Sequence, residues 1–126
     1  MNPKRFSKEK LPEEHVRAGF VALMEKRGWF VHITHGNQFS SGLPDLFCAH
    51  VNYGVRWIEV KHADAYHFTR DQLRVFPQMT SKGVGIWIIA LPRNYTEHQL
   101  VYEYENVIVN GPPNWTKYQG HSKRPY

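Results

Sequence analysis

The sequence predicts an α/β fold in which one helix is followed by three strands, a second helix and a fourth strand. Three observations support this prediction. An apolar stripe at helical spacing lies near the start, four β-branched or aromatic runs are bounded by turn residues, and a helix-capping pattern lies between the third and fourth runs. The expected architecture is therefore a mixed central sheet with helices packed on it.

The opening helix is predicted between Pro12 and Gly28. Pro12 suits a first helical turn, acidic residues follow it, and Gly28 comes after the last periodic position. The apolar stripe of this helix is formed by Val16, Phe20, Leu23 and Met24.

Four runs rich in β-branched and aromatic residues predict strands. The stretch VNYG at 51–54 joins the second run to the third and is typical of a hairpin turn. The stretch LVYEYENVIV at 100–109 is expected to add one or two further strands. The four main runs cover residues 29–35, 44–51, 55–62 and 84–91.

A second helix is predicted from a capping box. Thr69 and Gln72 have the spacing of that motif, and the helix is expected to reach about Ser81 and to stop at Gly83. Pro77 lies inside this helix and is expected to kink or shorten it.

The length of 126 residues and the hydrophobic content of 41% suit a single domain with its own core. We expect this core over about residues 11–109, with short basic tails at both ends. No apolar run is long enough for a membrane span or a signal sequence, so no membrane association is expected. Cys48 is the only cysteine, which excludes an internal disulfide and a cysteine-based metal site.

The net charge of +5 is concentrated at the two ends of the chain. Residues 1–10 and 117–126 are basic, whereas the part between them is close to neutral. Short basic arms with aromatic residues close by suit a phosphate backbone, and hence a nucleic acid partner. The alternative is that both arms are simply solvated tails.

Two carboxylates and a lysine are predicted to converge on the second and third strands. Glu59 and Lys61 point to the same face because side chains alternate along a strand. If the hairpin turn centres on residues 52 and 53, Asp45 lies opposite them. Mg²⁺ and Mn²⁺ are often held by one or two carboxylates, so Asp45 and Glu59 are candidate metal ligands, and Lys61 could act on a water or on phosphate charge. A cross-strand ion pair is the alternative interpretation.

The opening helix adds a third candidate carboxylate. At helical spacing Glu13 lies with Val16 on the inward face, whereas Glu14 falls away from it. Glu13 is therefore the better candidate, and Glu14 is the alternative. An acidic residue that answers the helix dipole would explain either glutamate without any site.

The order of these motifs resembles the PD-(D/E)XK nuclease superfamily, in particular its VRR-NUC branch, with the archaeal Holliday junction resolvases as second relatives. The resemblance spans about residues 13–91 and rests on an acid in the first helix, GLPDLF, WIEVKHA and FTRDQ. It implies a restriction-endonuclease-like core, DNA as substrate and Mg²⁺ or Mn²⁺ as cofactor.

The resemblance also implies a role for each matching residue. The implied catalytic residues are Glu13, Lys61 and Gln72, and the implied metal ligands are Asp45, Glu59 and the backbone carbonyl of Val60. For Gln72 the capping box offers a second explanation, since it could serve only as the partner of Thr69.

Histidines raise the alternative of a zinc site, which their placement disfavours. His32 and His35 point to opposite faces of one strand and cannot share an ion. His35 and His62 are instead candidates for contact with phosphate. The stretch 35–42 contains no phosphate-loop lysine and is expected to be a loop leading to Pro44.

A set of aromatic residues falls within apolar elements. We expect these side chains in the core rather than in a base-stacking platform. They are Trp29, Phe30, Trp57, Phe76 and Trp87.

The residues and the resemblance together predict a metal-dependent DNA endonuclease that acts on junctions, flaps or forks in repair or recombination. Two alternatives remain: a sequence-specific endonuclease of the homing or restriction kind, and a non-catalytic DNA-binding protein of the same fold. Resolvase-like relatives imply a homodimer. Access to DNA implies a cytoplasmic or other intracellular location, in a prokaryote or a phage.

Overall fold

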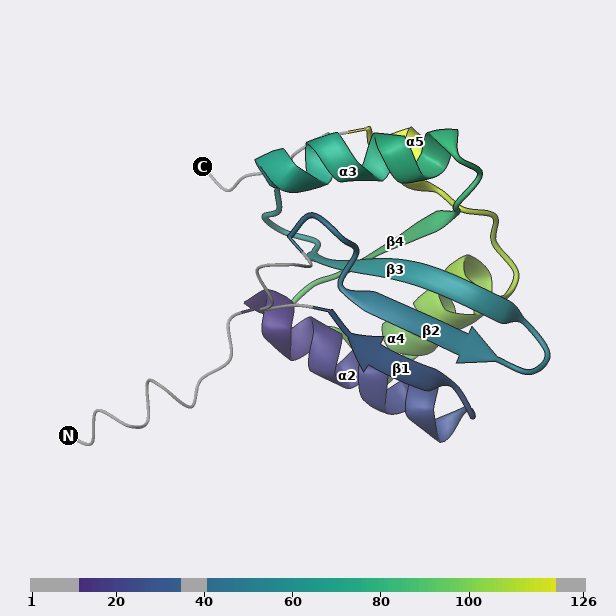
Figure 1. Cartoon of the computed structure of the whole chain (residues 1–126). Coiled ribbons are helices and arrows are strands. Elements are labelled where there is room, and N and C mark those ends of the chain that lie inside the picture. Colours follow the sequence, from purple (N-terminus) through teal and green to yellow (C-terminus); the bar gives the residue numbers. More distant parts are fainter. Residues whose placement is uncertain (1–11, 35–40, 120–126) are drawn as a thin grey trace.

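The computed structural model describes residues 12–34 and 41–119, and it contains the helix, three strands, helix and strand in the predicted order (Figure 1). No helix in these two stretches is long and apolar enough to cross a lipid bilayer. The elements are α2 (Pro12–Lys26), β1 (Phe30–Ile33), β2 (Leu46–His50), β3 (Gly54–His62), α3 (Arg70–Ser81), β4 (Ile86–Leu91), α4 (Glu97–Tyr102), η2 (Glu103–Val109) and α5 (Trp115–Tyr118).

The four strands form one mixed sheet in the order β1-β2-β3-β4. The first three strands pair antiparallel, and β4 pairs parallel to β3 after the crossover through α3. In the hairpin of β2 and β3, Leu46 lies opposite Ile58. This register is within one position of the one expected from a turn at residues 52 and 53.

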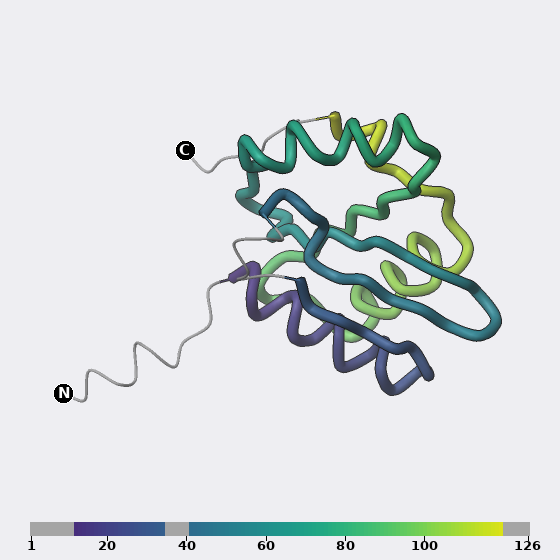
Figure 2. Tube along the Cα trace, in the orientation of Figure 1, coloured from purple at the N-terminus to yellow at the C-terminus, as the bar shows by residue number. Residues whose placement is uncertain are grey.

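Helices cover both faces of the sheet, which gives three layers (Figures 1 and 2). One hydrophobic cluster joins α2 and η2 to the sheet through Phe20, Met24 and Ile108. A second cluster joins α3 and α5 to the opposite face through Phe76 and Trp115. The second core thus extends past residue 109, where we expected the C-terminal tail to begin.

β3 extends beyond its partner β2, and the site lies where the pairing of these two strands ends. Ile58 is the last residue of β3 that pairs with β2, whereas the pairing with β4 continues to His62. The side chains of Ile58 and Val60 belong to the hydrophobic cluster between the sheet and α2. By alternation Glu59 and Lys61 face the side covered by α3.

The stretch 100–109 is helical, so the prediction of one or two strands there is wrong. Thr96 and Gln99 form a capping box that starts α4, and the chain continues into the π-helix η2. Within η2 the buried residues are Tyr104 and Ile108, which are four positions apart, as on one face of a helix. A strand would have buried every second residue instead.

The free edge of β4 is occupied by side chains, which also prevents a further strand from pairing there. Asn114 exchanges two hydrogen bonds with the backbone of Ile88, at 2.6 and 3.0 Å. The N–H of Ala90 donates to the carboxylate of Glu103 at 3.2 Å. These bonds satisfy backbone groups that an edge strand would otherwise expose.

Two sequence-based details also differ from the structure. Pro77 lies inside α3 but does not shorten it, since the helix reaches Ser81. Pro77 and Leu73 are both exposed, so the carbonyl that loses its partner faces solvent. Phe30 is not a core residue, because its side chain is 60% exposed. Trp57 is only partly buried, whereas Trp29, Phe76 and Trp87 are buried as predicted.

The segment before Asp45 is packed against α3. The Ser41 hydroxyl hydrogen-bonds the carboxylate of Asp71. Gly42 has a φ of +88°, and a Cβ atom there would lie 2.8 Å from the carbonyl oxygen of Asp71 and 2.8 Å from a methyl group of Val75. Glycine is therefore needed here both for its backbone conformation and for the close approach of the two segments.

We predict that Gly42→Ala lowers the free energy of unfolding by about 2 kcal/mol or more, because strain at positive φ adds to a steric clash. Gly54→Ala is the matched control, since Gly54 has a φ of +81° and a Cβ atom there would meet nothing within 4 Å. This control should lose only about 1 kcal/mol. Urea unfolding measures both values, and equal losses would contradict the proposed packing against α3.

Candidate active site

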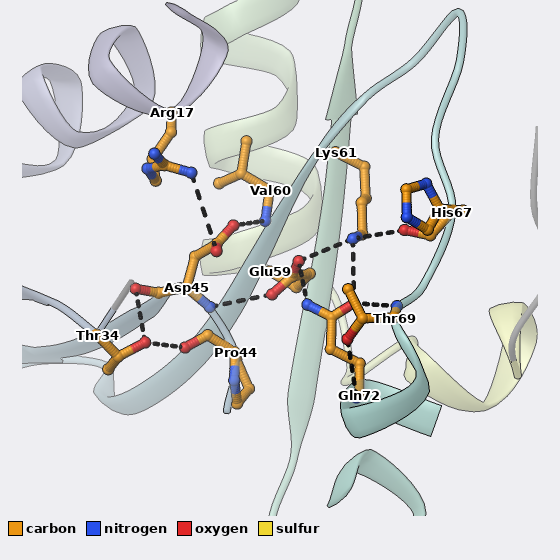
Figure 3. A network of polar contacts seen from close by, with 10 residues as sticks. All are labelled: Arg17, Thr34, Pro44, Asp45, Glu59, Val60, Lys61, His67, Thr69 and Gln72. Carbon is orange, nitrogen blue, oxygen red and sulfur yellow. Dashed lines mark hydrogen bonds and ion pairs between the residues drawn. The ribbon is translucent and has the colours of Figure 1, made fainter. Parts of the chain in front are cut away.

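Two carboxylates meet where β2 stops pairing with β3. Asp45 lies just before Leu46, the first residue of β2. The backbone N–H of Asp45 donates to Glu59 Oε1 at 3.0 Å, and Asp45 Oδ2 accepts the N–H of Val60 at 3.0 Å (Figure 3). Side chains thus take the place of ladder hydrogen bonds, and each carboxylate is held by the backbone of the neighbouring strand.

Lys61 is buried beside these carboxylates. Its Nζ lies 2.9 Å from Glu59 Oε2, and it donates to the carbonyl oxygen of His67 at 2.9 Å and to Gln72 Oε1 at 3.2 Å (Figure 3). The ammonium group also lies 4.6 Å from the centre of the Phe68 ring. Each of its three protons therefore has an oxygen within bonding distance.

Gln72 connects the start of α3 to the site. Its backbone N–H donates to Thr69 Oγ1 at 3.1 Å, and its Oε1 accepts the N–H of Thr69 at 3.0 Å, which completes the capping box. Its Nε2 donates to Glu59 Oε2 at 2.8 Å. The two explanations considered for Gln72 are compatible, because one side chain both caps the helix and lines the site.

α2 contributes two charged residues from its first turns. Carboxylate oxygens of Glu13, Asp45 and Glu59 lie within 4.8 Å of one another, whereas Glu14 is not part of this group. Arg17 is buried, and its Nη1 lies 3.9 Å from Asp45 Oδ1 (Figure 3). The sequence analysis missed Arg17, although it lies one helical turn after Glu13 on the same apolar face.

The carboxylates are energetically costly as anions in this setting. Burial raises the pKa of Glu59 from 4.5 to about 8, and the charge of Asp45 acts in the same direction while Lys61 opposes it. Burial also raises the pKa of Glu13, against the opposing charges of Lys61 and Arg17. When all three carboxylates are ionised, their negative charges outnumber the positive charges of Lys61 and Arg17, so the site carries a net negative charge.

The donor set fits a hard cation such as Mg²⁺ or Mn²⁺. All three side chains offer oxygen, and hard cations prefer oxygen ligands. The N–H and C=O of a strand residue point to the same side, so the Val60 carbonyl faces the side on which its N–H meets Asp45. Within residues 12–34 and 41–119, no histidine or cysteine belongs to a group of three potential ligands.

The histidine candidates are placed differently. His62 follows Lys61 in β3, and its backbone hydrogen-bonds Glu13. Its Nε2 is buried, lies 3.5 Å from Asp64 Oδ2, and has no hydrogen-bond partner among the described residues. His50 lies at the turn end of the hairpin, where its Nε2 contacts the carbonyl of Arg27. His35 lies outside the described residues.

The fold of this chain is similar to that of two solved structures. The chain is similar to a structure described as a VRR_NUC domain, with 20% identity and a TM-score of 0.58 over 77% of this chain and 98% of that chain. It is also similar to Hjc, a Holliday junction resolvase from the archaeon Archaeoglobus fulgidus, with 18% identity and a TM-score of 0.47 over 64% of this chain and 69% of that chain.

The likeness to the VRR_NUC domain confirms the restriction-endonuclease-like α/β fold that the sequence motifs indicated. No protein-family profile matches the chain, and no curated protein matches it significantly.

We predict that the metal-free protein loses stability as the pH rises from about 5 to 8. Glu59 and Glu13 have raised pKa values in the folded state, so the folded protein binds more protons than the unfolded chain above pH 4.5. The unfolding free energy therefore falls through this window, and the melting temperature should fall by about 5 °C or more. Added Mn²⁺ at pH 8 should restore it, because the cation binds the ionised carboxylates.

The control for this prediction is Glu59→Gln, measured by thermal unfolding in chelator. Its pH profile should be flatter, since one titrating group has been removed. Its absolute stability is not the readout, because the new amide would place a donor against Gln72 Nε2. Identical slopes in wild type and Glu59→Gln would contradict the assignment of the pH effect to Glu59.

Proposed function

We propose that this protein is a Mg²⁺- or Mn²⁺-dependent nuclease that hydrolyses phosphodiester bonds in DNA. The observation that carries the proposal is the convergence of three carboxylates within 4.8 Å, with the Lys61 ammonium 2.9 Å from Glu59. Burying such a group is costly unless the charges have a use, and ionisable groups shifted by burial and by each other cluster at functional sites. The VRR_NUC-like fold supports the same proposal.

Asp45 and Glu59 would hold the metal ion, and the Val60 carbonyl would be a third protein ligand. Glu13 is the third carboxylate beside them. Bound there, Mg²⁺ or Mn²⁺ supplies Lewis-acid chemistry that makes water a stronger nucleophile at neutral pH and offsets charge on the phosphate. Arg17 is a positioning residue in this proposal, since its charge lies beside Asp45 and limits the repulsion between the carboxylates.

Lys61 is assigned to the reacting phosphate. Its ammonium can orient the attacking water and can stabilise the extra charge that develops on the phosphate oxygens. The water oxygen forms the new bond to phosphorus, the bond to the 3′-oxygen breaks, and that oxygen leaves with a proton, so that 5′-phosphate and 3′-hydroxyl ends result. Gln72 holds both Lys61 and Glu59 in place for this step. His62, whose Nε2 has no hydrogen-bond partner among the described residues, is a candidate for contact with a flanking phosphate.

A non-catalytic DNA-binding protein of the same fold is the second candidate, and one observation favours it. All three protons of Lys61 already have acceptors in Glu59, Gln72 and the His67 carbonyl. A closed network of this kind could serve stability alone. Catalysis by Lys61 requires that one of these contacts be exchanged for substrate.

Nicking of supercoiled plasmid distinguishes these two functions. In Mg²⁺ or Mn²⁺ the wild type should nick the plasmid, and a chelator should stop it. Lys61→Ala should lower kcat by about 100-fold or more with DNA affinity nearly unchanged, because the ammonium acts mainly in the transition state. Lys26→Ala is the matched control, since this exposed lysine lies at the distal end of α2. Nicking by Lys61→Ala at the wild-type rate would overturn the role assigned to Lys61, whereas a wild type that does not nick with any divalent metal would favour the non-catalytic function.

We further propose that the nuclease selects branched DNA, such as junctions, flaps or forks, rather than a base sequence, as in repair or recombination. The described helices pack in the two hydrophobic clusters, and none of them projects from the domain to read base edges as a recognition helix does. Phosphate contacts position DNA without specifying its sequence. A homing-like or restriction-like specificity would require another element, such as a loop over 35–43, most of which lies outside the described residues. A homodimer and an intracellular location with access to DNA remain part of this proposal.

Four-way junctions, flaps, splayed arms and linear duplexes built from the same strands test this selectivity. We expect incision near the branch, and the cut should move with the branch when the sequence is permuted. Cleavage at one fixed sequence in linear duplex, regardless of branching, would show sequence specificity instead.

A further inference from the structure

The sheet face that carries Glu59 and Lys61 continues as an aromatic surface. Side chains two positions apart on a strand share a face, so Trp57 precedes Glu59 on this face of β3. Phe47 and Trp57 are paired across the strands, with ring centres 5.0 Å apart. The row of rings nearest the site is therefore one alternation step, about 6–7 Å along β3, from Glu59.

A second row lies one step further from the site. Phe30 on β1 pairs with Ala49 on β2, and Ala49 pairs with Val55 on β3. The Phe30 ring lies 6.5 Å from the Phe47 ring, so the two rows form a continuous surface. His32 completes the first row, since it lies opposite Phe47. We call this surface the aromatic platform; it consists of Phe30, His32, Phe47, Ala49, Val55 and Trp57.

The helices leave much of the aromatic platform open. The second cluster packs α3 and α5 against Ile86 and Ile88 of β4 and against Trp57, at the opposite side of the sheet from β1 (Figure 1). Phe30 is 60% exposed and Val55 is 50% exposed. A phenylalanine exposed to this degree, in line with other rings, is unusual for a surface that only faces water.

We propose that the aromatic platform stacks unpaired bases of the DNA strand whose phosphate occupies the acidic site. This inference rests on the proposed nuclease function and extends it to the substrate, which would contain a single-stranded segment next to the cut. Aromatic rings bind bases without sequence preference because every base has a π-face.

The position of the platform favours bases over a second copy of the chain. Its first row begins one step along β3 from Glu59, so a strand with its phosphate at the carboxylates has its neighbouring bases within reach of the rings. In paired DNA the faces of these bases are already stacked in the duplex. Splayed or flapped DNA offers free bases at this place, which gives a physical reason for selecting branched substrates.

The test uses splayed-arm DNA with 2-aminopurine as the unpaired base beside the branch, and the same label within a full duplex. In chelator, where no strand is cut, the wild type should quench the label in the splayed arm. Phe30→Ala should reduce the quenching and weaken splayed-arm binding by about tenfold, with duplex binding unchanged. Phe30→Leu should behave like Phe30→Ala, because it keeps apolar area but removes the π-face.

Tyr102→Ala is the matched control. Tyr102 is 55% exposed on α4, which covers the opposite face of the sheet, so its loss should change neither affinity. Equal losses of splayed-arm and duplex affinity in Phe30→Ala, or no loss in either, would overturn the inference. So would a wild-type dimer that Phe30→Ala dissociates without any change in DNA affinity, since the platform would then be an interface between copies.

Cleavage separates this inference from the proposed function. In Mg²⁺, Phe30→Ala should lower the ratio of kcat/KM for splayed arms to that for duplex. If the variant cuts DNA with the wild-type ratio, the inference fails and the nuclease function stands. If the wild type cuts no DNA but quenches the label through Phe30, the nuclease function fails and base stacking stands.

Discussion

The hydrogen bond from the Val60 N–H to the Asp45 carboxylate is the interaction on which the site depends. β2 stops pairing with β3 at Ile58, and the next inward N–H of β3 would be left without a partner in a buried place. Asp45 supplies that partner, and its own N–H in turn binds Glu59. The same two bonds that end the antiparallel ladder therefore hold two carboxylates close together, against their mutual repulsion.

The polar network around Glu59 shows how the fold tolerates this repulsion. Lys61 and Gln72 both reach Glu59 Oε2, and Gln72 is itself fixed by the first turn of α3 through Thr69. The network thus ties the site to the helix that covers it. Removing one partner would leave buried polar groups unsatisfied, which costs more than the net value of a typical hydrogen bond. Burial still raises the pKa of Glu59, so the network compensates only part of the cost and leaves the site favourable to a cation.

The two faces of the sheet are covered differently. The face that packs against α2 holds a continuous apolar core that includes Ile58, Val60 and Met24. The opposite face is divided: α3 and α5 cover β4, while the part toward β1 carries the exposed ring of Phe30. The acidic site lies between these parts, at the end of β2. This division lets one strand, β3, place a core residue and a site residue in alternation.

Local signals in the sequence were sufficient for the main elements and for most of the site. Alternation on β3 put Glu59 and Lys61 on one face, the hairpin register brought Asp45 to them, and the capping box located Gln72, because each of these relations spans few residues or one turn.

Long-range packing decided the rest. Residues 103–109 fit both a strand and a helical period, and burial of Tyr104 and Ile108 against the sheet favours the helix that the Thr96 capping box starts. Phe30 is apolar and lies in a strand, but whether a helix covers it depends on where α3 and α5 pack on the sheet. Arg17 becomes part of the site only because α2 packs beside Asp45. The sequence by itself therefore determined which side chains share a face, whereas the tertiary structure decided which faces meet, since that depends on contacts between segments far apart in the chain.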